Sequence, residues 1–292
     1  MGVRRAVEMA TAAISDAAEN DPAKQFPIYT LGPLIHNPQV LDALSKQGVK
    51  VLDTPCQIHA GAAVIIRAHG VSPGVEQTLV EQGARIIDAT CPRVKANQNT
   101  AFALAEKGYT IFLAGEKDHA EIQGIYGYCL AGHAKQDKNF IIVGNSNDAD
   151  RRASEFVKKL KDFPQKTALI GQTTISEDEY CSIAQAIKNH FPDLEVKNTI
   201  CDATRDRQNA LRELCSAVDA VIIAGGKESA NTRRLLSIAR DCGRDAWLAE
   251  TAVDLPTELL LWKAATTEKK IGLSAGASTP DSVIDEIEQA LL

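Results

Sequence analysis

The stretch IIDATCPRVKANQNTAFAL, residues 86–104, predicts a buried strand, a cysteine and an amphipathic helix in direct succession. A similar succession occurs in KNTICDATRDRQNALREL, residues 197–214, where Cys201 takes the position that Cys91 has in the first stretch. A comparable length before Cys91 reaches the basic, alanine-rich segment GVRRAVEMATAA, residues 2–13. Such internal similarity indicates repeated structural units. The sequence therefore predicts three similar α/β units, with boundaries at 1–91, 92–196 and 197–292.

Short β-branched runs alternate with helical patterns along the rest of the chain, which predicts an α/β fold with mainly parallel sheets. The predicted strands lie at 28–31, 63–67, 110–114, 140–143, 167–171, 220–224 and 271–274. The predicted helices lie at 37–47, 73–82, 92–107, 151–161, 176–190, 203–216, 228–241 and 280–291.

Composition excludes several classes of protein. No apolar run approaches the roughly 20 residues that span a bilayer, and Glu8 interrupts the N-terminal segment, which is unlike a signal peptide. The net charge of -6 gives no field that attracts nucleic acid. We therefore expect a cytoplasmic protein with neither a membrane nor a nucleic-acid partner.

The seven cysteines are odd in number and irregularly spaced, unlike a secreted disulfide framework. A thiolate at a helix N-terminus is stabilised by unpaired backbone N–H groups and by the helix dipole, which suits it to bind metal. Cys91 and Cys201 fit this description, and we predict that both are metal ligands. The other five cysteines are expected to be buried structural residues: Cys56, Cys129, Cys181, Cys215 and Cys242.

Three histidines lie at or beyond the ends of predicted strands. They are His36 in LGPLIHN, His69 in IIRAHGV and His119 in GEKDHAE, two residues before Glu121. The carboxyl ends of strands are where ligands bind in open α/β sheets. A binding or catalytic site is predicted there.

Two loops resemble anion-binding turns: GGKESANTRR, residues 225–234, and SAGASTPD, residues 274–281. Each joins a strand to a helix, and helix N-termini with Ser and Asn side chains bind phosphate. The same pattern also occurs in ordinary capped turns, and neither loop is a Walker A motif or a dinucleotide fingerprint. Thr173 and Thr174 in GQTTISEDEY, residues 171–180, can likewise cap a helix or contribute to a site.

Ten short motifs together resemble the LytB family of 4-hydroxy-3-methylbut-2-enyl diphosphate reductases. In order along the chain they are GVRRAV, LIHN, AHGVS, DATCP, HAEIQG, QTT, ICDAT, RQ, SAN and SAGASTPD. The resemblance implies a trefoil-like arrangement of three α/β units around a central 4Fe-4S cluster. It also implies reductive dehydroxylation of the substrate to isopentenyl diphosphate and dimethylallyl diphosphate, with ferredoxin or flavodoxin as the electron donor.

The resemblance also assigns roles to individual residues. Cys91 and Cys201 match two of three cluster ligands, which leave one iron free for the substrate oxygen. Glu121 matches the proton donor, which requires a raised carboxyl pKa, and Thr173 matches the threonine that supports it and contacts the substrate. The residues that match the diphosphate-binding set are His36, His69, His119, Ser229, Asn231 and Ser278.

The chain departs from the family pattern at three places. The family motif G-F-C-x-G-V contains the first cluster ligand, and this chain begins at the residue that follows that cysteine. Ala230 stands where a second Ser is usual, and Asp202 follows Cys201.

These departures leave three alternatives open. The chain is an active reductase whose natural start lies upstream, a diphosphate-binding or regulatory relative with a labile cluster or none, or a structural protein stabilised by zinc on the same Cys and His residues.

Overall fold

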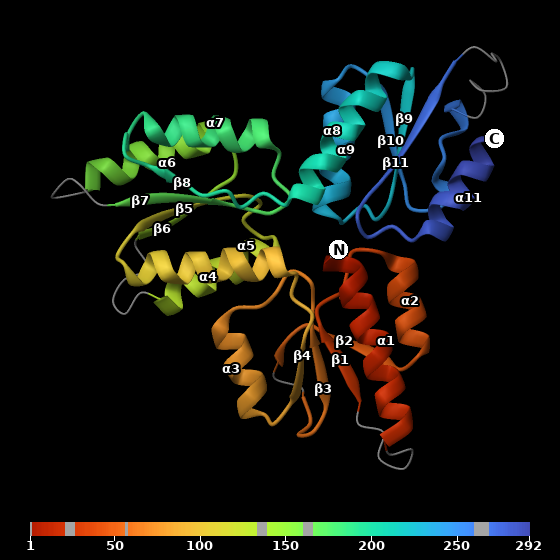
Figure 1. Ribbon diagram of the computed structural model, residues 1–292, viewed down its shortest axis with the longest axis horizontal. Helices are drawn as coiled ribbons and strands as arrows, with labels where there is room; N and C mark the ends of the chain where they lie inside the picture. The colour runs from red at the N-terminus through yellow and green to blue at the C-terminus, as the bar shows by residue number, and fades with distance from the viewer. Residues whose placement is uncertain (1, 21–26, 56–57, 133–138, 160–165, 260–268) are drawn as a thin grey trace.

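The computed structural model describes residues 2–20, 27–55, 58–132, 139–159, 166–259 and 269–292. Every strand pair in this part of the chain is parallel, which confirms the predicted α/β class. The strands form three sheets, arranged around a common centre in a trefoil-like fold (Figure 1). The first sheet has the order β2-β1-β3-β4, the second β6-β5-β7-β8 and the third β10-β9-β11.

The strand bounds follow the chain order. The first sheet contains β1 (Ile28–Leu31), β2 (Val49–Leu52), β3 (Ala63–Ile66) and β4 (Arg85–Asp88). The second contains β5 (Thr110–Ala114), β6 (Phe140–Val143), β7 (Thr167–Gly171) and β8 (Glu195–Val196). The third contains β9 (Ala220–Ala224), β10 (Asp245–Ala249) and β11 (Ile271–Ala275). Each sheet is built from one continuous part of the chain. The predicted division into units at 1–91, 92–196 and 197–292 remains a proposal.

Helices cover both faces of each sheet, which explains why the central strands are apolar throughout and do not alternate with polar residues. In β5, for example, Phe112 packs toward α6 and α7, whereas Ile111 and Leu113 pack toward α4 and α5. The helices of the first unit are α1 (Gly2–Asn20), α2 (Pro38–Lys46) and α3 (Pro73–Glu81). Those of the second are α4 (Pro92–Glu106), α5 (Ala120–Gly132), α6 (Ser146–Lys159) and α7 (Glu177–Lys188). Those of the third are α8 (Asp202–Ala217), α9 (Ala230–Asp241) and α11 (Asp281–Leu291), with the short 3-10 helix η3 (Ala252–Asp254).

Helix α5 was not predicted, because its sequence AEIQGIYGYCLAG is apolar on most sides and contains three glycines, which are poor helix formers. The structure shows what these glycines permit. A Cβ atom on Gly127 would lie 2.3 Å from the Cβ of Ser72, and one on Gly124 would lie 3.2 Å from the Gln98 amide nitrogen. Close packing against neighbouring elements therefore stabilises a helix that local propensity disfavours.

Other expectations need small corrections. Helix α6 begins at Ser146, before the predicted start, and residues 160–161 lie outside the described part of the chain. Strands β2, β8 and β10 are additional to the predicted set. The buried strand expected directly before Cys201 is not formed, and the exposed two-residue strand β8 lies upstream of it. Cys129 and Cys215 are buried as expected, but Cys181 and Cys242 are exposed because they lie on solvent-facing positions of α7 and at the end of α9. Cys56 lies outside the described residues.

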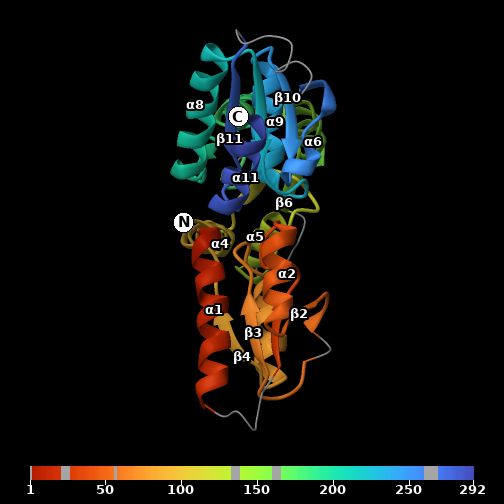
Figure 2. The same cartoon turned by 90° about the vertical axis from the view of Figure 1, so that its right-hand side faces the viewer.

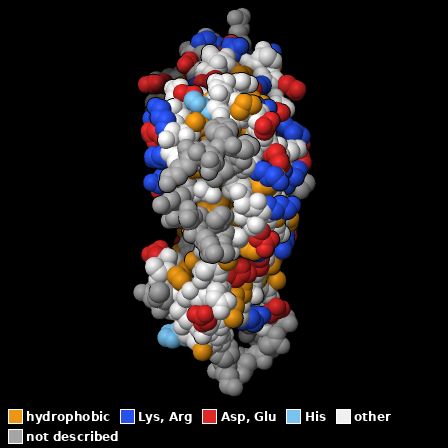
Figure 3. All heavy atoms as spheres, turned by 90° about the vertical axis from the view of Figure 1, so that its left-hand side faces the viewer, with side chains coloured by type: hydrophobic (Ala, Val, Ile, Leu, Met, Phe, Trp, Pro, Cys, Tyr) orange, Lys and Arg blue, Asp and Glu red, His pale blue; other side chains and the backbone are white. Residues whose placement is uncertain are grey.

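The surface charge of the described residues on one face of the molecule is mixed, with no large patch of a single sign (Figure 3). On the face shown in Figure 3, basic and acidic side chains are interspersed. No described helix has both the length and the apolar character needed to cross a bilayer. Figure 2 shows the first and third units at opposite ends of the molecule, with the N-terminal end of α1 between them.

Candidate active site

An inner cavity of about 240 Å³ lies where the three units meet, and all ten residues predicted for the site line it. They come from the carboxyl ends of strands and the starts of helices in all three units, as expected for parallel α/β sheets. The ten are His36, His69, Cys91, His119, Glu121, Thr173, Cys201, Ser229, Asn231 and Ser278.

Glu121, in the first turn of α5, is 1% exposed. Its Oε1 accepts a hydrogen bond of 2.7 Å from the Thr173 backbone N–H, and its Oε2 accepts one of 2.8 Å from the Thr173 hydroxyl. Burial raises the pKa of Glu121 to about 7, although both hydrogen bonds from Thr173 act to lower it. A carboxyl with this pKa can hold and release a proton near neutral pH.

The three histidines form one cluster. The ring centroids of His36 and His69 are 5.0 Å apart, those of His69 and His119 are 5.2 Å apart, and those of His36 and His119 are 6.4 Å apart. Burial lowers the pKa of all three, that of His119 to about 4. The rings are therefore neutral at pH 7.

A hydrogen bond decides what this cluster can bind. The ring nitrogens come within 4.8 Å of one another, a spacing that a metal ion could also use. However, Nδ1 of His119 accepts a 3.2 Å hydrogen bond from the Glu121 backbone N–H. The proton of His119 is then on Nε2, which makes that nitrogen a donor and not a metal ligand. This tautomer favours an anion over zinc at the histidines.

Several polar groups that line the inner cavity have no partner among the described residues. Both amide atoms of Asn231 are buried and have no hydrogen-bond partner among the described residues, and the same holds for Oγ of Ser278. Ser229 is the N-cap of α9, where its Oγ accepts from the Thr232 N–H at 3.3 Å, which leaves its own O–H free to donate. Buried polar groups in native proteins nearly always have partners, so these residues indicate a polar ligand.

The two cysteines are N-caps of the helices that follow them, Cys91 of α4 and Cys201 of α8. Neither side chain makes a capping hydrogen bond, and both are half-buried free thiols in the wall of the inner cavity. The start of α1 lies against Cys91, because a Cβ atom on Gly2 would be only 2.6 Å from its Sγ. The predicted pair of thiols is thus brought to one place.

Comparison with known proteins identifies the family. The family model described as "LytB protein" matches residues 1–292. The chain belongs to the LytB family. A protein of Treponema denticola named 4-hydroxy-3-methylbut-2-enyl diphosphate reductase is 42% identical and covers 100% of this chain and 95% of its own length. The reductase of the same name from Solidesulfovibrio magneticus is 40% identical with the same coverage.

Solved structures of LytB enzymes share the fold. The E-1-hydroxy-2-methyl-but-2-enyl-4-diphosphate reductase of Plasmodium falciparum superposes with a TM-score of 0.84 at 30% identity, over 99% of this chain and 83% of that one. A second structure, of (E)-4-hydroxy-3-methyl-but-2-enyl diphosphate reductase, is named as the terminal enzyme of the non-mevalonate pathway. It has a TM-score of 0.68 at 36% identity, over 100% of this chain and 94% of that one.

Two arginines in the inner cavity of this LytB chain were missed from the sequence. Arg93 lies in the first turn of α4 and Arg207 in the second turn of α8, in the helices that follow the two cysteines. Asp202 accepts hydrogen bonds from Arg93 and from Arg205, the latter at 2.9 Å. The available signal was an opposite charge within two residues of each cysteine, and the Arg93–Asp202 pair joins α4 to α8.

Proposed function

We propose that this chain catalyses the reductive dehydroxylation of 4-hydroxy-3-methylbut-2-enyl diphosphate. Two electrons and two protons convert the allylic alcohol to isopentenyl diphosphate or dimethylallyl diphosphate and release water. The observation that carries the proposal is the position of Glu121, a buried carboxyl with a pKa of about 7. It lines the same cavity as two free thiols and a set of neutral side chains that can donate hydrogen bonds to an anion. This combination supports proton delivery to a reduced, diphosphate-bearing substrate.

The protein groups divide into two sets. The neutral donors His36, His69, His119, Ser229, Asn231 and Ser278 bind the diphosphate. Glu121, oriented by Thr173, supplies a proton to the reacting end of the substrate. A closed, poorly hydrated cavity keeps that proton on the carboxyl until it is needed.

The chemistry of the thiols fits an iron-sulfur group. Two free cysteines at helix N-termini, facing one cavity, are suitable thiolate ligands, and we propose that Cys91 and Cys201 hold a 4Fe-4S cluster. When bound, such a cluster supplies electrons and a Lewis-acidic iron. Ferredoxin or flavodoxin is the proposed electron donor. The free thiols, with no disulfide among the described residues, support a cytoplasmic enzyme.

One observation favours a second candidate function. The side chains of Asn231 and Ser278, which have no partner among the described residues, and the neutral histidines suit a diphosphate ester whether or not the cysteines hold a metal. A relative that binds diphosphate esters but holds a labile cluster, or none, has the same histidines, Asn231 and Ser278. The two candidates differ in iron and sulfide content.

Reconstitution distinguishes the candidates. The chain and a version extended by one cysteine before Met1 are purified anaerobically and loaded with iron and sulfide. They are then assayed for metal content, EPR signal and turnover with a reduced viologen dye. The reductase is supported if either version holds four irons and forms the two diphosphate products. Diphosphate binding without iron in both versions supports the second candidate, and stoichiometric zinc would support a structural metal site.

A further inference from the structure

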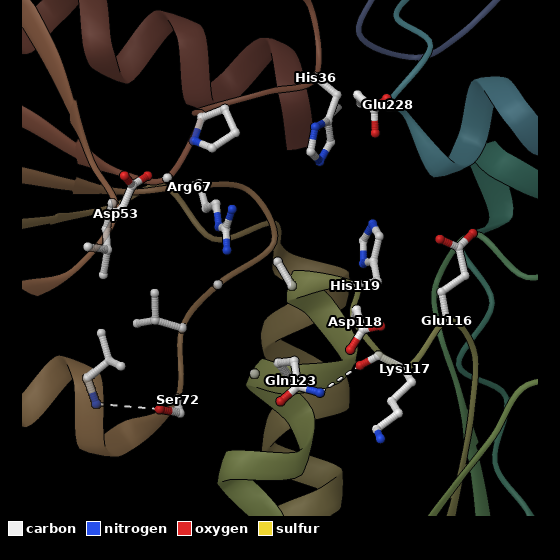
Figure 4. A pocket seen from close by; sticks show the side chains of 18 of the residues that line it. His36, Asp53, Arg67, Ser72, Glu116, Lys117, Asp118, His119, Gln123 and Glu228 are labelled. Atoms are coloured by element: carbon white, nitrogen blue, oxygen red, sulfur yellow. Dashed lines mark hydrogen bonds between the residues drawn. The ribbon is translucent and has the colours of Figure 1, made fainter.

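A larger outer cavity of about 810 Å³ adjoins the inner one (Figure 4). The two cavities share His36 and His119, which line both. Figure 4 shows that His36, His119 and Arg67 point toward the same hollow. A ligand held by the histidines is therefore also within reach of groups in the outer cavity.

Arg67 is a half-buried cation without a carboxylate partner. It follows β3, and no described carboxylate lies within ion-pair distance of its guanidinium, including Asp53 in the same cavity. Its Nε is buried and has no hydrogen-bond partner among the described residues. By contrast, Arg233 in the same cavity pairs with Glu116 at 2.8 Å. Because an unpaired buried charge costs free energy, Arg67 is a candidate for a functional role.

None of the inner-cavity groups proposed to bind the diphosphate is positively charged, since the histidines are neutral and Ser229, Asn231 and Ser278 carry no charge. The two arginines of this cavity, Arg93 and Arg207, lie in the helices that follow Cys91 and Cys201. Arg93 is already paired with Asp202 on the cysteine side. The charge of Arg67, in contrast, reaches the histidine cluster, since it adds to burial in lowering the pKa of His36, His69 and His119.

We propose that Arg67 binds the diphosphate group from the outer cavity and supplies the positive charge that the neutral donors lack. The inference rests on the proposed function for the identity of the ligand as a diphosphate ester. Nε of Arg67 has no partner among the described residues and the side chain points toward the shared hollow, and a diphosphate is the kind of anion that a planar guanidinium binds through paired hydrogen bonds.

The test compares Arg67→Gln and Arg67→Lys with Arg85→Gln. Arg85 is exposed at the amino end of β4, in the same sheet but at the edge away from the cavities, so its variant loses the same charge elsewhere. We measure the Kd for isopentenyl diphosphate by calorimetry and, on the reconstituted protein, KM and kcat. Arg67→Gln is expected to raise Kd and KM roughly ten- to a hundredfold and to change kcat little. Arg67→Lys is expected to restore part of the binding, and Arg85→Gln to match the wild type.

Thermal unfolding separates binding from structure. Removal of an unpaired buried cation should leave the Tm of Arg67→Gln unchanged or raise it, whereas loss of a structural contact would lower it. A Kd within twofold of wild type, or a lowered Tm with weakened binding that Arg67→Lys does not restore, overturns the inference. If the wild type binds isopentenyl diphosphate but never turns substrate over, the reductase proposal fails while the Kd comparison still decides the role of Arg67.

Discussion

At the scale of single residues, the contact between the Glu121 carboxyl and Thr173 is central to the proposed chemistry. The carboxyl is buried, and each of its oxygens accepts one hydrogen bond from Thr173. The hydrogen bonds fix its position, and burial adjusts its pKa. Position and protonation are therefore controlled by different features of the fold.

Glu121→Gln tests the proton donor directly. Gln keeps the size of the side chain and an oxygen for the Thr173 N–H, but it cannot deliver a proton. We expect kcat to fall about 10² to 10⁴-fold while the Kd for isopentenyl diphosphate stays near the wild-type value. A kcat within tenfold of wild type would show that another group supplies the proton.

The pKa of Glu121 predicts the pH dependence of the reaction. Because the protonated form donates, kcat/KM should fall as pH rises through about 7. The Thr173 hydroxyl stabilises the ionised form, so Thr173→Val should raise the pKa of Glu121 and move this limb to higher pH. The measurement is the pH profile of kcat/KM for the wild type and for Thr173→Val. A limb that moves to lower pH in the variant would contradict the assignment of Glu121 as the proton donor.

Because the histidines are buried in their neutral form, the free energy of unfolding is expected to fall at acidic pH. The pKa of His119 is about 4 in the folded chain and 6.5 when unfolded, so below pH 6.5 the unfolded state binds a proton that the folded state excludes. Stability is therefore lost as pH falls from 6.5 toward 4, by up to about 1.4 kcal/mol per pH unit for this group. Urea unfolding at pH 7 and pH 5 should show a smaller loss for His119→Gln than for the wild type. An equal loss in both proteins would mean that His119 is not the group responsible.

At the scale of elements, helix starts combine structural and functional roles. The helices α4, α8 and α9 all begin at the inner cavity, where their first N–H groups and N-cap side chains meet. Ser229 caps α9, whereas Cys91 and Cys201 occupy N-cap positions without capping. At the N-termini of α4 and α8, a free thiol therefore stands where a capping side chain would otherwise be expected.

Two capping serines allow these roles to be separated. Ser229 caps α9 and Ser176 caps α7, but only Ser229 lines the inner cavity. Each Ser→Ala change should lower the free energy of unfolding by about 1 kcal/mol. Only Ser229→Ala should also weaken isopentenyl diphosphate binding, measured by calorimetry. Equal affinities in the two variants would restrict Ser229 to its capping role.

At the scale of the whole molecule, the site exists only when the three units are together. The Arg93 and Asp202 pair joins the second unit to the third across α4 and α8, and the Arg233 and Glu116 pair joins them again at the outer cavity. Exposed ion pairs of this kind contribute little free energy. A ligand that contacts all three units can therefore contribute much to their association.

Ligand binding should stabilise the assembled molecule. At a hundredfold excess over Kd, isopentenyl diphosphate should add about 2.7 kcal/mol to the stability, seen as a rise in Tm. Asn231→Asp places a negative charge among the diphosphate-binding residues and should abolish the rise. A rise of the same size in this variant would locate the ligand away from Asn231.

Much of this site followed from local sequence. The strands β1, β5, β6, β7 and β9 occupy their predicted residues, since short apolar runs between turns are a local signal. The repeated strand, cysteine and helix pattern indicated where Cys91 and Cys201 lie. Glycine-rich α5 and the strands β2, β8 and β10 were not predicted, because contacts with neighbouring elements stabilise them.

The sequence by itself determined which chemical groups stand at strand ends and helix starts. Only the tertiary structure decided that all ten predicted residues line one cavity and that Arg67 has no carboxylate partner in the described part of the chain. It also decided that Glu121 holds a proton near pH 7 while the histidines lose theirs. The physical reason is that secondary structure depends on neighbours along the chain, whereas proximity and desolvation arise when distant segments pack together.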